Sequence, residues 1–151
     1  MKLEAATGAA LQLAIQSYQF PDVREDRWES NWVVIRGTVE NAEQQWRFEE
    51  PCLTTFELEE LADWLEKIGQ GSVDLDQLAF TEPNLKFSYS VYPEPALHVR
   101  FANGSAPPWL TELERRSGVT VIFPASPETL HSAAAALRDM LNDFPIRGGA
   151  A

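Results

Sequence analysis

The clearest structural signal in this chain is EPCLTTFELEELADWLEKIG, residues 50–69. Thr54 precedes Glu57 by three residues, the spacing at which a hydroxyl and a carboxylate cap each other's backbone N–H groups. One face of the resulting helix is apolar, with Leu58, Leu61, Leu65 and Ile68. The opposite face is acidic, with Glu59, Glu60, Asp63 and Glu66. The segment predicts an amphipathic helix over 54–68 with an anionic outer face, and it places Trp64 at the border between the two faces.

The segment before this helix has the pattern of β-structure. Residues 11–15 alternate in polarity, as in a half-buried strand. Residues 31–39 are apolar on both parities, which predicts a central strand covered on both faces. A polar turn then leads to 45–48, where Trp46 and Phe48 share one face. We expect these last two segments to form a hairpin.

The segment after this helix contains further strand candidates. They are 75–80, a weak candidate, then 85–91 and 97–101, which predict a hairpin with one solvated face, and 119–123. The proline-bearing stretch around Trp109 is expected to be irregular.

A second helix is expected over 127–143. Ser126 is a suitable N-cap and Pro127 suits the first helical position, where its missing N–H costs nothing. An apolar stripe follows, made of Leu130, Ala134, Leu137 and Leu141. Strands, a helix, strands and a helix predict an α+β fold with a mainly antiparallel sheet of about six to seven strands. Two helices, 54–68 and 127–143, pack on it.

The length of 151 residues supports a single domain over 1–151. Its ends, 1–8 and 147–151, are expected to be mobile. The single cysteine cannot form an internal disulfide, and the start of the chain lacks the apolar core of a secretion signal. No apolar run is long enough to cross a bilayer. We therefore expect a cytoplasmic protein.

The charge is concentrated in the middle of the chain. The 12 basic and 23 acidic residues give a net charge of -11, and all of the excess lies within 22–82. Nucleic acid and anionic membranes are unsuitable partners, because association of two polyanions costs Coulomb work and releases no counterions. Basic protein partners fit better. A merely solvated acidic face is the alternative.

The sequence offers few groups for catalysis. His98, His131 and Cys52 have no metal-ligand spacing, and no glycine-rich phosphate loop or nucleophile elbow is present. Cys52 lies in an apolar context that favours a core position over a nucleophile. We expect a non-enzymatic protein with no metal and no cofactor. A glycoside hydrolase that uses a carboxylate pair stays open as an alternative.

Two segments resemble the WapI-type immunity proteins of bacterial polymorphic toxin systems. They are QFPDVREDRWESNW at 19–32 and the sequence at 50–65. The positions that carry the resemblance are Phe20, Pro21, Asn31, Trp32, Pro51, Cys52, Leu53, Thr55, Glu57, Leu58, Trp64 and Leu65. FPIR at 144–147 resembles the end of the family. Glu50 stands where the family is expected to have Asp, and 69–118 matches nothing that identifies a toxin.

The resemblance implies a cytoplasmic protein that binds and neutralises the nuclease domain of a toxin, typically one that acts on tRNA. The charge favours the same partner, because a nuclease must attract a polyphosphate and so presents a basic face. Most motif residues are expected to build the core. The expected contacts are Asp22, Glu25, Asp26, Trp28, Glu29, Glu59, Glu60, Asp63, Trp64 and Glu66. An acidic adaptor for another basic protein and a small-ligand module are the alternatives, and the sequence does not indicate an oligomeric state.

Overall fold

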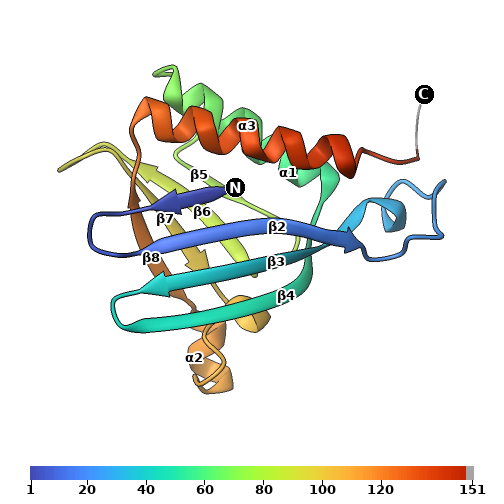
Figure 1. Cartoon of the computed structure of the whole chain (residues 1–151), viewed down its shortest axis with the longest axis horizontal. Helices are drawn as coiled ribbons and strands as arrows, with labels where there is room; N and C mark the ends of the chain where they lie inside the picture. Colours follow the sequence, from blue (N-terminus) through green and yellow to red (C-terminus); the bar gives the residue numbers. More distant parts are fainter. Residues whose placement is uncertain (149–151) are drawn as a thin grey trace.

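The computed structural model describes residues 1–148, which fold into two antiparallel sheets and accompanying helices (Figure 1). The first sheet contains β1 (Lys2–Glu4), β2 (Ala10–Tyr18), β3 (Trp32–Asn41) and β4 (Gln44–Thr54). The second contains β5 (Gln77–Ala79), β6 (Leu85–Ser90), β7 (Ala96–Phe101) and β8 (Val119–Pro124). The α-helices are α1 (Thr55–Gly69), α2 (Glu112–Ser117) and α3 (Pro127–Asp143). Short 3₁₀ turns occur at η1 (Glu29–Asn31) and η2 (Asn103–Ser105).

Each sheet is a meander in which consecutive strands pair. A long helix follows each meander, so four strands and then a helix occur twice along the chain, with α2 inserted before β8. The predicted α+β class is confirmed. Within residues 1–148 the number of strands is eight rather than six or seven, and they form two sheets instead of one.

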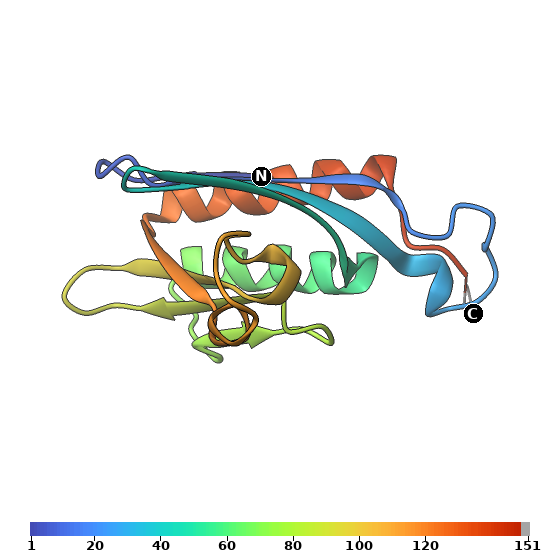
Figure 2. The ribbon, with the colours of Figure 1, turned by 90° about the horizontal axis from the view of Figure 1, so that it is seen from below.

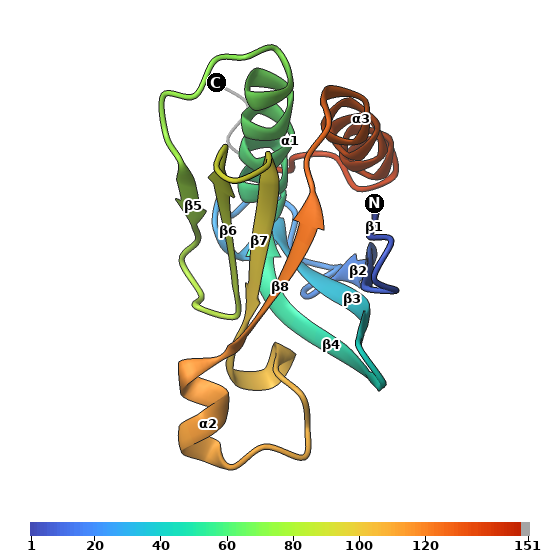
Figure 3. The same ribbon diagram turned by 90° about the vertical axis from the view of Figure 1, so that its left-hand side faces the viewer.

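The two predicted helices are confirmed, and their caps explain their starts. In α1, Thr54 Oγ1 accepts a hydrogen bond from the Glu57 N–H (3.2 Å), and Glu57 Oε1 accepts one from the Thr54 N–H (3.0 Å). In α3, Ser126 Oγ accepts one from the Thr129 N–H (3.1 Å), and Pro127 follows at the start of the helix. The two helices lie side by side along one side of the molecule, opposite α2 (Figures 1 and 3).

One hydrophobic core joins both sheets to these helices. The sheets meet at Phe101 of β7, whose ring centroid lies 5.7 Å from that of Trp46 and 6.1 Å from that of Phe48. The Trp46 indole N–H donates to the Ser105 carbonyl (3.0 Å). Trp46 and Phe48 therefore share the buried face of their hairpin, as the sequence predicts.

The central strand β3 is covered on one face only, which corrects the expectation of two covered faces. Val33, Ile35 and Val39 are buried, whereas Arg36 between them is exposed. The apolar residues of the other parity, such as Val34, are only half-buried. Apolar content alone therefore overstated the burial of this strand.

The N-terminal end is part of the first sheet. The expected mobile segment 1–8 contains β1, in which Leu3 pairs with Leu11 and is buried. The amino group of Met1 donates to the Leu13 carbonyl (2.9 Å). At the other end, Arg147 is bound to the rest of the molecule, and residues 149–151 of the expected mobile segment lie outside the described residues.

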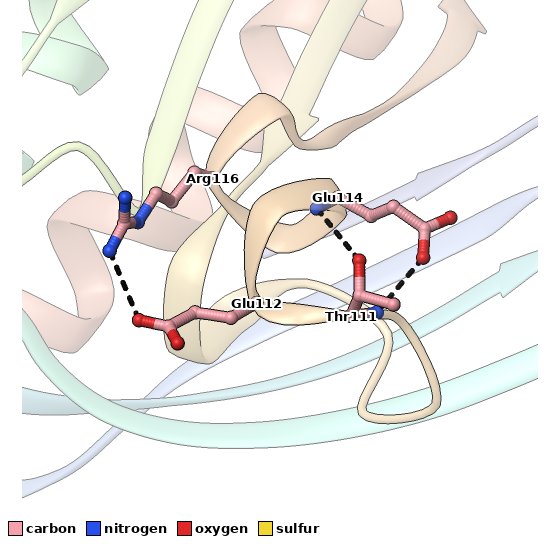
Figure 4. A network of polar contacts seen from close by, with 4 residues as sticks. All are labelled: Thr111, Glu112, Glu114 and Arg116. Carbon is pink, nitrogen blue, oxygen red and sulfur yellow. Dashed lines mark hydrogen bonds and ion pairs between the residues drawn. The ribbon is translucent and has the colours of Figure 1, made fainter.

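The stretch expected to be irregular around Trp109 contains a short helix, α2. Thr111 and Glu114 form the same reciprocal cap as at α1, and Arg116 Nη2 lies 3.0 Å from Glu112 Oε1 (Figure 4). No side chain of α2 is buried, so the apolar stripe that marks the longer helices is absent from this six-residue helix. No helix within residues 1–148 is both long and apolar enough to cross a membrane.

Candidate functional site

The first part of the candidate site is the loop at 19–31, which joins β2 to β3. It projects past the end of the second sheet (Figures 1 and 2). Asp26 Oδ1 accepts hydrogen bonds from the N–H groups of Trp28 (2.8 Å) and Glu29 (2.7 Å). Trp28 is 61% exposed, and its ring lies edge-on to Phe56 at the start of α1, with centroids 6.5 Å apart. The loop therefore holds a large aromatic side chain in solvent beside α1.

The buried side chain of Asn31 fixes this loop from inside. Its Oδ1 accepts hydrogen bonds from Thr55 Oγ1 (2.6 Å) and from the Arg147 N–H (2.8 Å). Its Nδ2 donates to the carbonyl groups of Arg27 and Arg147, each at 2.7 Å. One amide thus joins the loop, the first residue of α1 and the segment after α3.

The acidic side chains expected at the loop are all exposed: Asp22, Glu25, Asp26 and Glu29. Two cations lie among them in the sequence, Arg24 and Arg27, and the Arg27 guanidinium sits 4.5 Å from the centre of the Phe56 ring. Residues 22–29 therefore carry a formal charge of -2, less than the acidic residues alone would give.

The second part of the site is the outer face of α1, where the expected acidic residues fall into two groups. Glu59 and Glu60 are exposed and form no ion pair with another residue of 1–148. Asp63 Oδ1 and Glu66 Oε2 lie 2.9 Å and 2.6 Å from Arg138 Nη2 of α3. Both carboxylates are therefore held in an ion pair within the protein, and Arg138 offsets one of their two charges.

Trp64 belongs to the core, which corrects its expected place at the border of the helix faces. It is 7% exposed, and its indole N–H donates to the Leu75 carbonyl (2.9 Å). The segment between α1 and β5 covers it. Of the two tryptophans expected at the partner surface, the structure places only Trp28 in solvent.

A third feature, which the sequence reasoning did not predict, is a cleft of about 520 Å³ beside the loop, where the two sheets meet. We call it the acidic cleft. Among residues 1–148 its only charged lining residues are Glu29, Glu50 and Glu82, and its aromatic wall is formed by Phe20 and Trp32. The remaining lining residues are Gln19, Pro51, Cys52, Asn84, Asn103 and Gly104.

Separate elements position the three carboxylates of the acidic cleft. Glu29 begins the 3₁₀ turn η1 at the end of the loop. Glu50 lies in β4 at a β-bulge, where the register with β3 shifts and where Pro51, which has no N–H, is tolerated. Glu82 follows Thr81, whose N–H donates to Glu57 Oε2 of α1 (2.7 Å). The cleft therefore depends on contacts between segments that are distant in sequence.

Cys52 lines the cleft but is 2% exposed. Burial raises the pKa of its thiol to about 12, and the Glu50 carboxylate contributes to the rise. The thiol is therefore protonated at neutral pH, which suits the core position expected for it and not a nucleophile.

Within residues 1–148 no group of three or more His, Cys, Asp or Glu side chains is arranged to hold a metal ion. His98 lies on the half-exposed face of β7, with its Nε2 atom 3.0 Å from Ser90 Oγ of β6.

The comparison with protein families assigns the chain to a class, the immunity proteins. The chain belongs to the Immunity protein WapI-like family, whose model matches residues 2–145. The resemblance seen at 19–32 and 50–65 is thereby confirmed. The comparisons with curated proteins and with solved structures give no significant match. Membership supports the role of an immunity protein, whose partner is a cognate toxin.

Proposed function

We propose that this protein acts in the cytoplasm as a non-enzymatic inhibitor of a nuclease toxin, typically a tRNase, by covering the basic face of the toxin domain. The observation that carries the proposal is Trp28, which is 61% exposed on a loop whose backbone is fixed by Asp26 and Asn31. A rigid exposed aromatic residue surrounded by charge is the usual anchor of a protein interface. No cofactor takes part.

The charges around Trp28 support a basic partner. A nuclease domain concentrates positive charge where it binds phosphates, so acidic groups on the inhibitor speed the encounter. The groups that remain unpaired, Glu59 and Glu60 on α1 and the carboxylates of the loop, contribute most to this attraction. Asp63 and Glu66 contribute less because Arg138 offsets one of their two charges, and the buried Trp64 is not part of the proposed contact surface.

Rigidity of the loop also favours binding. Each side chain or loop that is ordered only on association subtracts from the affinity. The hydrogen bonds of Asn31 and Asp26 order the loop before the partner arrives. Little of the free energy gained from contacts of Trp28 is therefore spent on ordering the loop, and these contacts should contribute almost fully to the affinity.

The test uses the C-terminal domain of the toxin encoded by the neighbouring gene. Trp28→Ala is compared with Trp109→Ala, which removes another exposed tryptophan, one whose ring packs against Trp46 of β4. We expect Trp28→Ala to weaken binding by about 30-fold or more and to reduce protection of cells that express the toxin, because a central aromatic anchor is worth about 2 kcal/mol or more. Trp109→Ala should change the dissociation constant by less than about threefold, as expected outside a binding surface.

The outcomes separate the candidate functions. Failure of the unmodified protein to bind or protect would overturn the immunity proposal. If Trp28→Ala and Trp109→Ala weaken binding equally, the loop is not the contact surface. Hydrolysis of a carbohydrate that is abolished by Glu50→Gln would instead favour the glycoside hydrolase, because the acidic cleft combines carboxylates with an aromatic wall.

A further inference from the structure

The acidic cleft offers only negative charge to an incoming group. None of Glu29, Glu50 and Glu82 forms an ion pair with a residue of 1–148, and no lysine or arginine lines the cleft. Carboxylates that share a cleft repel one another, and the repulsion is stronger where water is partly excluded. A cation entering the cleft would relieve this repulsion.

Gly104 leaves the space that Glu50 occupies. A Cβ atom at position 104 would overlap the carboxylate of Glu50, so the absence of a side chain there allows this carboxylate to lie against the turn after β7. Both residues line the cleft. The position of the Glu50 charge at the cleft wall is therefore set by a contact between the two sheets.

A second acceptor lies in the same cleft. Asn84 is only 9% exposed and lines the cleft. Its Nδ2 donates to Ser105 Oγ (3.2 Å), while its Oδ1 accepts no hydrogen bond from a residue of 1–148. Among the described residues the buried side-chain atom without a partner is Arg100 Nε, so Asn84 Oδ1 is accessible to solvent and free to accept a hydrogen bond from a ligand. It therefore suits a ligand that carries hydrogen-bond donors.

The walls of the cleft add a shape requirement. Phe20, on the loop, is 41% exposed, and Trp32 begins β3 beside it. Aromatic faces bind a planar cation by stacking and by cation–π attraction. A guanidinium is planar and carries five N–H donors for carboxylate and amide oxygens, whereas an ammonium is compact and strongly hydrated.

We infer that the acidic cleft binds the side chain of one arginine presented by the toxin domain. This inference rests on the proposed function and names the group that the site captures. Nucleic-acid-binding proteins use arginine to hold phosphate and bases. An arginine held between Glu50, Asn84 and the aromatic wall is withdrawn from the substrate of the toxin, so capture in the cleft would contribute to inhibition.

The binding chemistry is tested without the toxin, by NMR titration with the peptide acetyl-Gly-Arg-Gly-amide. The reporters are the indole N–H of Trp32 and the backbone N–H of Gly104, both at the cleft. We expect saturable shifts with the arginine peptide and at least fivefold weaker binding of the lysine peptide. The citrulline peptide, which has the same shape without charge, should give no saturable shift. Equal responses to arginine and citrulline would overturn the inference.

Variants then locate the site. Glu50→Gln keeps the shape of the side chain and removes its charge, and Glu43→Gln removes an equal charge from the exposed β3–β4 turn. We expect Glu50→Gln to weaken binding of the arginine peptide at least fivefold and Glu43→Gln less than twofold. Equal weakening by both would show general attraction by a polyanion and would overturn the inference. Gly104→Ala, which displaces the Glu50 carboxylate, should act like Glu50→Gln if it folds.

The same variants separate this inference from the proposed function. If the unmodified protein binds the toxin domain and Glu50→Gln binds it equally well, the cleft is not the site of capture, while the immunity role stands. If the unmodified protein does not bind the toxin domain, the proposed function fails, and the peptide titration still reports whether the cleft selects arginine.

Discussion

Asn31 and Arg147 are 116 positions apart, yet the side chain of one pairs with the backbone of the other. Asn31 Oδ1 accepts from the Arg147 N–H (2.8 Å), and Asn31 Nδ2 donates to the Arg147 carbonyl (2.7 Å). The Asn31 side-chain amide thus pairs with the Arg147 backbone through one donor and one acceptor, as a neighbouring strand would. The Arg147 guanidinium also donates to the carbonyl of Pro21 (3.0 Å) and lies 3.7 Å from the centre of the Tyr18 ring. The loop that carries Trp28 is therefore held by the far end of the chain.

Asn31→Ala should destabilise the protein by about 3 kcal/mol. The substitution leaves the buried hydroxyl of Thr55 and the backbone groups of Arg27 and Arg147 without their partner. Urea denaturation measures the loss. Asn142→Ala, at an exposed position of α3, is the matched control and should change the free energy of unfolding by less than about 0.5 kcal/mol. An equal, small effect of both substitutions would show that water replaces the Asn31 amide.

Leu61→Ala tests the packing of α1 and should cost about 2–5 kcal/mol. Leu61 is fully buried, so the change removes apolar contacts and leaves a cavity. Leu113→Ala, at a leucine that is 72% exposed on α2, should cost less than about 0.5 kcal/mol. Thermal or urea unfolding gives both values. A cost for Leu61→Ala below about 1 kcal/mol would contradict the burial of this face of α1.

Gly37→Ala should destabilise the first sheet because a Cβ atom at position 37 would overlap the ring of Phe48 on the neighbouring strand. We expect a loss of about 1–3 kcal/mol, typical of overpacking. Gly69→Ala is the control, since its Cβ would lie at ordinary contact distance, 3.4 Å from the Leu130 Cβ. Adding Phe48→Leu should recover part of the loss. If the stability losses of Gly37→Ala and Phe48→Leu simply add, the Phe48 ring is not what excludes the methyl group.

The helices could be predicted from the sequence because their signals are local. Thr54 and Glu57 cap each other within one turn, and Ser126 caps α3 by accepting from the Thr129 N–H, without help from distant residues. The identical cap at Thr111 was missed because α2 has no apolar stripe to accompany it. The burial of Trp64 was missed for another reason, since the cover comes from the segment around Leu75 and not from the helix itself.

The acidic cleft and the Asn31 network could not be predicted because their members meet only in the folded chain. Asn31 stands out in the family resemblance, but two of its partners, Thr55 and Arg147, lie 24 and 116 positions away. Glu50 differs from the residue expected at its position, yet nothing in the sequence places it against Gly104. The distribution of charge along the sequence correctly placed the acidic residues on the surface. It did not show that Arg138 pairs with Asp63 and Glu66.

Stability above pH 8.5 should depend on Cys52. The pKa of the thiol is raised to about 12 by burial, so the folded protein keeps the proton that the unfolded chain loses near its ordinary pKa of about 8.5–9. This contribution is complete below that value and is lost as the pH rises through the folded pKa. The stability of the unmodified protein relative to Cys52→Ala should therefore fall by up to about 1.4 kcal/mol per pH unit above pH 9. Urea midpoints between pH 8 and 10.5 measure it, and a constant difference would contradict the burial of the thiol.

The association rate with the toxin domain should distinguish the two groups of acidic residues on α1. Reversal of Glu59 and Glu60 to Lys removes two unpaired charges and adds two opposing ones, so the on-rate should fall by about tenfold at low salt. Asp63→Asn with Glu66→Gln removes two carboxylates that share an ion pair with Arg138, which offsets one of their two charges, and should change the on-rate by less than about threefold. The difference should vanish near 1 M salt, where the Debye length is about 3 Å.

Stopped-flow association at several salt concentrations measures these rates, and circular dichroism confirms that each variant is folded. An on-rate that the Glu59 and Glu60 reversals leave unchanged would show that the face of α1 is solvated surface, with the loop at 19–31 and the acidic cleft as the contact with the toxin.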